Sequence, residues 1–517
     1  MVVVFSSVSP PSPTTSTTTP RPSSTPVATA DGKRAEYGGY FAPPPPPAEL
    51  LVPDVTVGSE SYTDYGVNGF TLSQQDALST FSIDVDTASY SIARRKLNEG
   101  GLPPQAAVRS EEFVNAIDYD YAAPKTDSFA VSMDAMPDPF RAGHHILRVG
   151  VQGKELSEAQ RPTVHLTFLV DVSGSMSSAD KLPMAQESLN LLVDRLQEGD
   201  TVALCTYAGR VATILPATDV SNKRMIHDAI SALQSGGSTA MSSGIDLAYE
   251  QAWSSFEKGA ENRVIILSDG DANVGRTSWE DMLAQIKGYA DKGVTVTTVG
   301  FGQGNYKDTL MEQLANKGDG NSFYIDSREQ AKKVFVEDMG SSMITIARDV
   351  KIQVEFNDDS VLAYRLIGYE NRDIADKDFR NDRVDAGEVG SGHSVTALYD
   401  VILKDGYEKE LAQVRLRWEA PGADKAAVEK LWVFQANRLA ETVSMANVDT
   451  RIAYGAGTLA EVLRGSPHAA EIELGELARF TSKSIRPAHK EDRELVGLIE
   501  TADRLGADQV KAAVSVR

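Results

Sequence analysis

Residues 165–175 read His165-Leu166-Thr167-Phe168-Leu169-Val170-Asp171-Val172-Ser173-Gly174-Ser175, an apolar run joined to a motif of alternating acidic and hydroxyl residues. The apolar run predicts a buried strand that ends at the motif. Asp171, Ser173 and Ser175 can then direct three hard oxygen atoms at one point, and such oxygens suit Mg²⁺ or Mn²⁺ better than Zn²⁺. On its own, a run of this kind more often forms a Ser-rich turn in which the acid caps the next helix.

Two later segments supply oxygen atoms from comparable places. Gly236-Gly237-Ser238-Thr239 precedes a predicted helix, and Ser268-Asp269-Gly270 follows the predicted strand Arg263–Leu267. Between residues 161 and 347, strands alternate with helices, which predicts a doubly wound, mostly parallel α/β sheet with helices on both faces. Ligands of such sheets bind beyond the carboxyl ends of the strands, at the topological switch point. The arrangement therefore favours a binding site over a capping turn.

This order of strand, motif, hydroxyl loop and strand-Asp-Gly resembles a von Willebrand factor type A domain with a complete metal-ion-dependent adhesion site. The resemblance implies a bound Mg²⁺, with Mn²⁺ or Ca²⁺ as alternatives. Ser268 stands where the family usually has Thr, a departure that leaves the neighbouring acid in place. Matched residue by residue, the implied metal ligands are Asp171, Ser173 and Ser175 in the first loop, Thr239 in the second and Asp269 in the third.

The composition bounds the architecture and the class of partner. The chain has 517 residues, too many for one ordinary core, and its 41% hydrophobic and 24% charged residues are typical of globular domains. A formal net charge of −22 disfavours nucleic acid and anionic membranes as partners. The single cysteine, Cys205, lies in a predicted core strand, so no intrachain disulfide forms and the redox compartment stays open. No run approaches about 18 apolar residues, so no transmembrane segment is predicted.

Strand and helix patterns divide the chain into five predicted regions, with the A domain inserted between the strands of a small β-sandwich. Asp84 and Asp86, followed by Thr87 and Ser89, are predicted to belong to a helix cap and not to a metal loop, because no partner acids follow at matching places. The regions are a disordered Ser/Thr/Pro-rich tether (1–76), a mainly helical N-terminal extension (77–127), the β-sandwich (128–160 and 348–420), the A domain (161–347) and a helical C-terminal domain (421–517).

A wider resemblance covers most of residues 78–510. It is to bacterial von Willebrand factor type A proteins with an N-terminal extension and a helical C-terminal domain, an envelope lipoprotein-like family. The segments that carry it are Phe81-Ser82-Ile83-Asp84-Val85-Asp86-Thr87-Ala88-Ser89-Tyr90 and Tyr364-Arg365-Leu366-Ile367-Gly368-Tyr369-Glu370-Asn371-Arg372. The resemblance implies an extracytoplasmic protein of the cell envelope, tethered to a surface through its N-terminal region; a cytoplasmic location is the alternative. No lipobox cysteine precedes the tether, which departs from the family pattern and puts lipid anchoring in doubt.

The predicted function is metal-dependent protein binding, for adhesion or assembly, in which an acidic side chain of a partner completes the metal's coordination. The alternatives are an intracellular cofactor of an ATPase-driven assembly or metal-insertion complex, and a metal that only stabilises the fold. Catalysis is not predicted, because the sequence has no P-loop, no His-Glu-x-x-His and no Gly-x-Ser-x-Gly motif. Its seven histidines also show no metal-ligand spacing.

Overall fold

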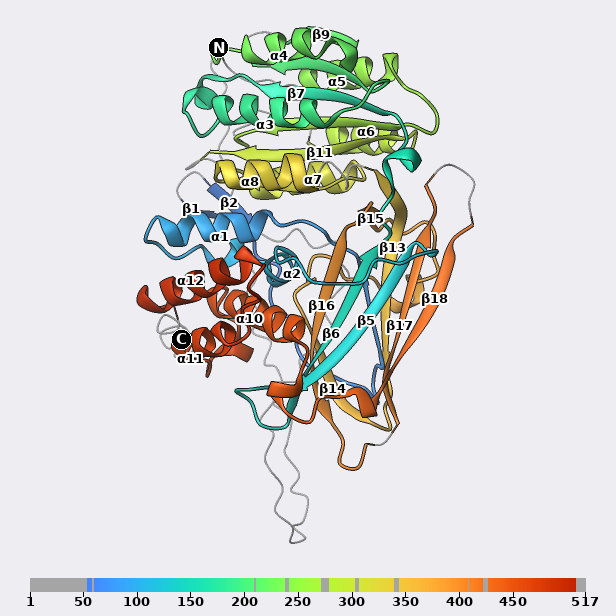
Figure 1. Ribbon diagram of the computed structural model, residues 1–517, viewed down its shortest axis with the longest axis vertical. Helices are drawn as coiled ribbons and strands as arrows, with labels where there is room; N and C mark the ends of the chain where they lie inside the picture. The colour runs from blue at the N-terminus through green and yellow to red at the C-terminus, as the bar shows by residue number, and fades with distance from the viewer. Residues whose placement is uncertain are drawn as a thin grey trace, which may run out of the picture. The chain divides into compact units, whose positions relative to one another are not determined.

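The computed structural model of the chain describes residues 54–57, 60–208, 211–237, 241–270, 279–302, 306–338, 344–407, 409–421 and 426–507. These described residues belong to one compact unit. The described strands make a two-stranded hairpin, a six-stranded sheet and two five-stranded sheets (Figure 1). Among the described residues, no helix is both long enough and apolar enough to cross a membrane.

The six-stranded sheet is the α/β sheet that the alternating pattern predicts. Its strand order is β12-β11-β10-β7-β8-β9, and every neighbouring pair is parallel except the edge pair β8 and β9. All eight residues of β7 are buried, as expected for a central strand covered on both faces. Because β7 lies between β8 and β10, its carboxyl end is the topological switch point. The strands are β7 (Val164–Asp171), β8 (Thr201–Tyr207), β9 (Ala212–Asp219), β10 (Glu261–Ser268), β11 (Val294–Phe301) and β12 (Ser322–Ile325).

Helices cover both faces of this sheet, and each face has its own apolar core (Figure 1). The spacing of apolar residues in α3 predicts one buried face, and Ala185, Leu189 and Leu192 are fully buried there. One face packs against α3 (Leu182–Arg195), α4 (Lys223–Ser231), α8 (Arg328–Lys332) and the π-helical turn η5 (Lys333–Asp338). The other packs against α5 (Met241–Ser254), α6 (Trp279–Ala290) and α7 (Asp308–Lys317).

Two five-stranded sheets enclose the apolar core of the predicted β-sandwich. In β13, apolar residues alternate with mostly polar ones, and this alternation places Ile352, Val354 and Phe356 in the core. One sheet has the order β15-β13-β17-β18, with β4 also paired to β13, and the other has the order β3-β14-β16-β6-β5. The strands are β3 (Thr71–Leu72), β4 (Leu78–Ser82), β5 (Phe129–Pro137), β6 (His144–Gly153), β13 (Thr345–Phe356), β14 (Val361–Ile367), β15 (Gly387–Gly390), β16 (Ser394–Leu403), β17 (Glu410–Glu419) and β18 (Val428–Gln435).

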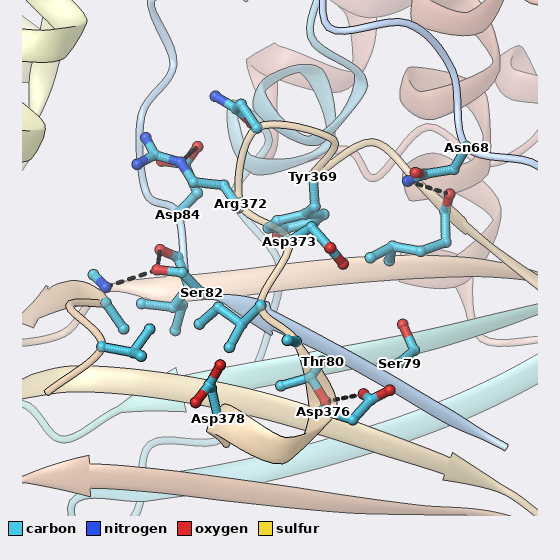
Figure 2. Close-up of a pocket in the computed structure, with 18 of the residues that line it drawn as sticks. Asn68, Ser79, Thr80, Ser82, Asp84, Tyr369, Arg372, Asp373, Asp376 and Asp378 are labelled. Atoms are coloured by element: carbon cyan, nitrogen blue, oxygen red, sulfur yellow. Dashed lines mark hydrogen bonds and ion pairs between the residues drawn. The ribbon is translucent and has the colours of Figure 1, made fainter. Parts of the chain in front are cut away.

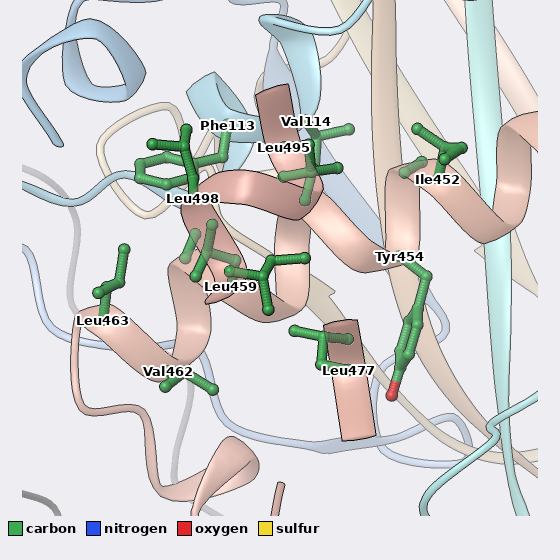
Figure 3. Packing of buried hydrophobic residues seen from close by; sticks show 14 of the residues in the cluster. Phe113, Val114, Ile452, Tyr454, Leu459, Val462, Leu463, Leu477, Leu495 and Leu498 are labelled. Carbon is green, nitrogen blue, oxygen red and sulfur yellow. The ribbon is translucent and has the colours of Figure 1, made fainter. Parts of the chain in front are cut away.

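The C-terminal helices pack with two helices of the N-terminal extension around a common core, as Figure 3 shows. Phe113 and Val114 from α2 share this core with Leu459, Leu477 and Leu498. Burying each such side chain stabilises the fold by about 1.5–3 kcal/mol relative to leaving it exposed. The helices are α1 (Ala88–Asn98), α2 (Ser110–Asn115), α10 (Val448–Leu463), α11 (Leu474–Ser482) and α12 (Lys490–Arg504).

Part of the segment predicted as a disordered tether is ordered. The strands β1 (Asp54–Val57) and β2 (Glu60–Thr63) form an antiparallel hairpin, and β3 joins the sandwich, although all three lie within residues 1–76. Tyr62 is fully buried, and Glu60 lies 2.9 Å from Arg95 and 2.8 Å from Lys96 of α1. These partners come from a distant part of the sequence, so local composition does not reveal them.

The region predicted as a helical C-terminal domain, residues 421–517, begins instead with strand β18. This strand pairs with β17 and is the last strand in the order of its sheet. Val428 and Leu431 are exposed, at 38% and 50%, so the strand lacks the clean alternation that marks a half-buried strand in a sequence. Helices fill the region from Val448 onward, as predicted.

Candidate functional site

The first loop of the predicted site leaves the carboxyl end of β7. Asp171 is the last residue of the strand, and a 3₁₀ turn, η3 (Gly174–Ser177), follows directly. The backbone N–H of Ser173 donates to Asp171 Oδ1 at 2.8 Å, and Ser173 Oγ lies 2.8 Å from Ser175 Oγ. Asp171 is buried, Ser175 is half-buried and Gly174 is exposed. The side chains of Asp171, Ser173 and Ser175 therefore lie between the carboxyl end of β7 and the protein surface.

The second loop lies directly against the first. The N–H of Gly236 donates to the carbonyl of Val172 at 2.7 Å, and the N–H of Gly174 donates to the carbonyl of Gly237 at 3.2 Å. These two bonds hold the glycine pair beside the first-loop hydroxyls. Thr239, the predicted second-loop ligand, lies outside the described residues, so its place in the site stays a prediction.

The third loop brings Asp269 to the same edge. Ser268 Oγ donates to Asp171 Oδ2 at 3.0 Å and accepts the N–H of Gly270 at 3.0 Å. The serine that replaces the family's usual threonine thus ties the first loop to the third. Gly270 has φ +77°, and a Cβ there would lie 2.5 Å from the backbone nitrogen of Lys307, so no larger residue fits.

Two carboxylates are buried at this site beside one ammonium group. Asp171 and Asp269 are both fully buried, and Asp171 Oδ2 also accepts from the hydroxyl of Tyr207 at 3.1 Å. Burial raises the pKa of Asp171, and the charge of Asp269 raises it further. Lys181 Nζ lies 2.9 Å from Asp269 Oδ2. The two carboxylates and the one ammonium together carry a charge of −1.

These groups fit a divalent cation of the Mg²⁺ type. Carboxylate and hydroxyl oxygens are the ligands such ions prefer, and a buried negative charge next to surface loops is stabilised by a cation. Within the described ranges, no three His, Cys, Asp or Glu side chains are grouped as metal ligands. A cation here would therefore depend on the hydroxyls of Ser173 and Ser175 in addition to the two acids.

A second group of buried charges was not predicted from the sequence. We call it the arginine cluster, and its members are Arg109, Arg372, Asp84, Asp86, Glu112, Asp308 and Glu312. Arg109 Nη1 lies 2.6 Å from Asp308 Oδ2 of α7, and Arg109 also pairs with Glu112 of α2. Arg372 Nε lies 2.9 Å from Asp84 Oδ2. The cluster therefore joins α7 of the A domain to the N-terminal extension and to the loop after β14.

The arginine cluster corrects the predicted helix cap. Thr87 is the N-cap residue of α1, but its side chain makes no capping hydrogen bond. Asp86 Oδ2 lies 3.2 Å from Arg372, and Asp86 Oδ1 accepts the N–H of Ser322. Ser89 Oγ donates to the carbonyl of Ala107. Long-range ion pairs and backbone contacts, which leave no local signal in a sequence, take these side chains away from the helix end.

A cavity of about 1530 Å³ lies beside the arginine cluster (Figure 2). Asp84 and Arg372 line it, together with Asp373, Asp376 and Asp378. Burial raises the pKa values of Asp373 and Asp376. None of the described residues of the predicted metal site lines this cavity, so it is a separate feature of the fold.

Family models match three segments of the chain. The model described as "von Willebrand factor type A domain" matches residues 165–337, and the one described as "von Willebrand factor" matches residues 56–148. The model described as "Uncharacterized protein YfbK, C-terminal" matches residues 341–505. The first of these matches covers all three loops of the candidate site.

Similar proteins extend this likeness along the chain. "Uncharacterized protein YfbK" of Escherichia coli (strain K12) is 35% identical over 474 residues, which span 86% of this chain and 81% of that protein. "Uncharacterized protein sll0103" of Synechocystis is 29% identical over 192 residues, or 37% of this chain and 44% of that protein. Among solved structures, "von Willebrand factor type A from Catenulispora acidiphila" is 16% identical with a TM-score of 0.43, and the match covers 74% of this chain and 97% of that one.

Proposed function

Since the chain belongs to the family of bacterial von Willebrand factor type A proteins that includes YfbK, we propose that its A domain binds a protein partner through a divalent cation and an acidic side chain of that partner. Domains of this type generally mediate protein–protein interaction. The observation that carries the finer proposal is the pair of fully buried carboxylates, Asp171 and Asp269, beside the exposed loop at Gly174.

In this proposal the two acids and the hydroxyls of Ser173 and Ser175 hold the cation. A bound Mg²⁺ would supply a coordination position for a carboxylate oxygen of the partner. Tyr207 and Ser268 keep the Asp171 carboxylate in place through the hydrogen bonds they donate to Oδ2. The proposal includes no catalytic step, because the described residues of the predicted site include no histidine that could activate water.

The same proposal places the protein in the cell envelope, with the Ser/Thr/Pro-rich residues 6–50 as its tether to a surface. The support is compositional, since such a segment buries too little apolar surface to fold alone. Fractionation of cells that express the intact gene checks the location. Recovery of the protein only in the cytoplasmic fraction would contradict it.

Calorimetric titration of Mg²⁺, Mn²⁺ and Ca²⁺ into the intact chain tests the site. The titrations are run with and without a short peptide that carries one Glu. We expect one cation per chain, and we expect Asp171→Ala to weaken its binding at least about 100-fold, because it removes a charged ligand. Asp228→Ala, the same change on an exposed residue of α4, is the control and should bind the cation as the parent does.

Two results would contradict the proposal. One is a folded parent that binds none of the three cations, with or without the peptide. The other is a folded Asp171→Ala variant that binds the cation as tightly as the parent. Circular dichroism spectra of the parent and both variants establish that each chain is folded.

A further inference from the structure

Lys181 occupies a position that is unfavourable for a lysine. It is the N-cap residue of α3, a helix of 14 residues, and the amino-terminal end of a helix carries a partial positive charge that repels cations. Lys181 is also only 6% exposed, and moving an ammonium group out of water costs several kcal/mol unless a well-placed partner offsets the cost. Helix formation therefore does not explain this residue.

The fold holds the Lys181 side chain in a fixed path to the candidate site. Its stem crosses Gly302, the residue after β11, where a Cβ would lie 2.2 Å from Lys181 Cε. Its own N–H donates to the carbonyl of Ser178 at 3.1 Å, and its carbonyl accepts the N–H of Ala185 at 2.8 Å. The Lys181 side chain ends at Asp269, with its Nζ 2.9 Å from Asp269 Oδ2. The absence of a side chain at Gly302 thus makes room for a lysine directed at the third-loop acid.

Lys181 changes the net charge of the candidate site. Among the described residues of the site, the charges of Asp171, Asp269 and Lys181 sum to −1, so a divalent cation brings this sum to +1 and a partner's carboxylate then brings it to zero. Without Lys181, the two acids and the cation would already be neutral, and a further carboxylate would add an uncompensated negative charge. In a partly buried site such an imbalance is unfavourable, because charges there are poorly screened.

We propose that Lys181 is a positioning residue that makes divalent-cation binding depend on the partner's carboxylate. The proposal rests on the metal-dependent function proposed above. By pairing with Asp269, Lys181 lowers the affinity for the cation alone and raises the preference for cation and acidic partner together. An A domain with this lysine binds its cation tightly only while it holds the partner.

Mg²⁺ titrations of the parent and of Lys181→Met, each with and without a peptide that carries one Glu, test this. In the parent, the peptide should strengthen Mg²⁺ binding about tenfold, the effect of one neighbouring charge in a poorly screened site. Lys181→Met should bind Mg²⁺ alone about tenfold more tightly than the parent, and the peptide should then change its affinity by less than about threefold. The same peptide with Gln in place of Glu is the ligand control and should have no effect on either chain.

Two further variants keep the test decisive. Lys181→Arg retains the positive charge, so its Mg²⁺ affinity should still depend on the peptide. Lys181→Gln removes the charge but keeps a hydrogen-bonding group for Asp269. It replaces Lys181→Met if that variant does not fold. Equal Mg²⁺ affinities and equal peptide effects in the parent and the uncharged variants overturn the role of Lys181 while the metal site stands. A parent that binds no Mg²⁺ in either condition overturns this proposal together with the proposed function.

Discussion

The arginine cluster and the candidate metal site both bury carboxylates, but different donors satisfy them. In the arginine cluster, Arg109 and Arg372 bind the acids with guanidinium groups, which stay charged and form several directed hydrogen bonds at once. At the candidate metal site, Asp171 accepts from a backbone N–H and two hydroxyls, and Asp269 pairs with the ammonium of Lys181. The arginine cluster therefore ties its acids to the fold through guanidinium groups, whereas the acids of the candidate metal site are held mostly by neutral donors.

The largest expected effect is in the arginine cluster. Arg109→Met leaves the buried Asp308 and Glu112 without their cation, which should lower the stability by about 3–5 kcal/mol. Urea denaturation of the intact chain measures this loss as a lower urea concentration at the midpoint of unfolding, and added Mg²⁺ should not restore the midpoint of the parent. Arg380→Ala is the control, because Arg380 is 61% exposed in its pair with Glu429 and should contribute at most about 1 kcal/mol. Equal effects of the two substitutions, or rescue of Arg109→Met by Mg²⁺, would remove the distinction between the clusters.

Glu111, which lies on α2 next to the arginine cluster, should make the stability of the fold depend on pH. Glu111 Oε2 accepts the N–H of Tyr369 at 3.0 Å, and within the described residues Oε1 has no hydrogen-bond partner. Burial, helped by the charge of Glu370, raises the pKa of Glu111 from 4.5 to about 7. The folded state therefore favours the protonated acid, so this residue's stabilising contribution is full below pH 4.5 and is lost as the pH rises through 7.

Glu111→Gln should remove that dependence, because the amide is neutral at every pH. The variant should become more stable than the parent as the pH rises from 5 to 8, by up to about 3 kcal/mol at the upper end. Urea midpoints at four pH values in this range measure the difference. The same change at the exposed Glu476 should give a difference that does not vary with pH. A flat difference for Glu111→Gln would show that the folded chain does not hold this acid protonated.

The meeting of the first and third loops could be predicted from the sequence, because each loop is a short local segment at the end of a strand. Asp171, Ser173 and Ser175 fall within five residues, and Asp269 directly follows a recognisable strand, so a sheet brings the two segments together at one edge. The arginine cluster has no such pattern, since Arg109 and Asp308 are 199 residues apart and meet only through tertiary packing. The same reason explains why β2 was predicted as tether, because its buried Glu60 and Tyr62 depend on α1.

Lys181 shows a second limit of reading the sequence. The local sequence does not distinguish Lys181 from any other lysine near the start of a helix. Its partner Asp269 is 88 residues away, and the space for its stem exists only because residue 302 is glycine. Neither fact is visible until β7, β10 and β11 lie side by side in the sheet.

The smallest expected effect tests the neutral donors of the metal site. Ser268→Ala removes the hydroxyl that donates to Asp171 and accepts from Gly270, both fixed by 3.0 Å hydrogen bonds. Stability should fall by about 1 kcal/mol, and Mg²⁺ binding should weaken about tenfold because the residue orients a ligand without being one. Ser254→Ala, which removes an exposed hydroxyl from α5, is the control and should leave the Mg²⁺ affinity unchanged.

The two readouts for Ser268→Ala separate a structural from a positioning role. A stability loss with unchanged Mg²⁺ affinity would mean that Ser268 only ties the loops together, and that Asp171 keeps its place through Tyr207 and its own backbone turn. Weaker Mg²⁺ binding with a small stability loss would mean that neutral donors orient the acid for the cation. Ser268→Thr keeps the hydroxyl and matches the usual family residue, so it should retain the Mg²⁺ affinity of the parent. Only in that case is the departure from the family pattern at residue 268 without consequence for the site.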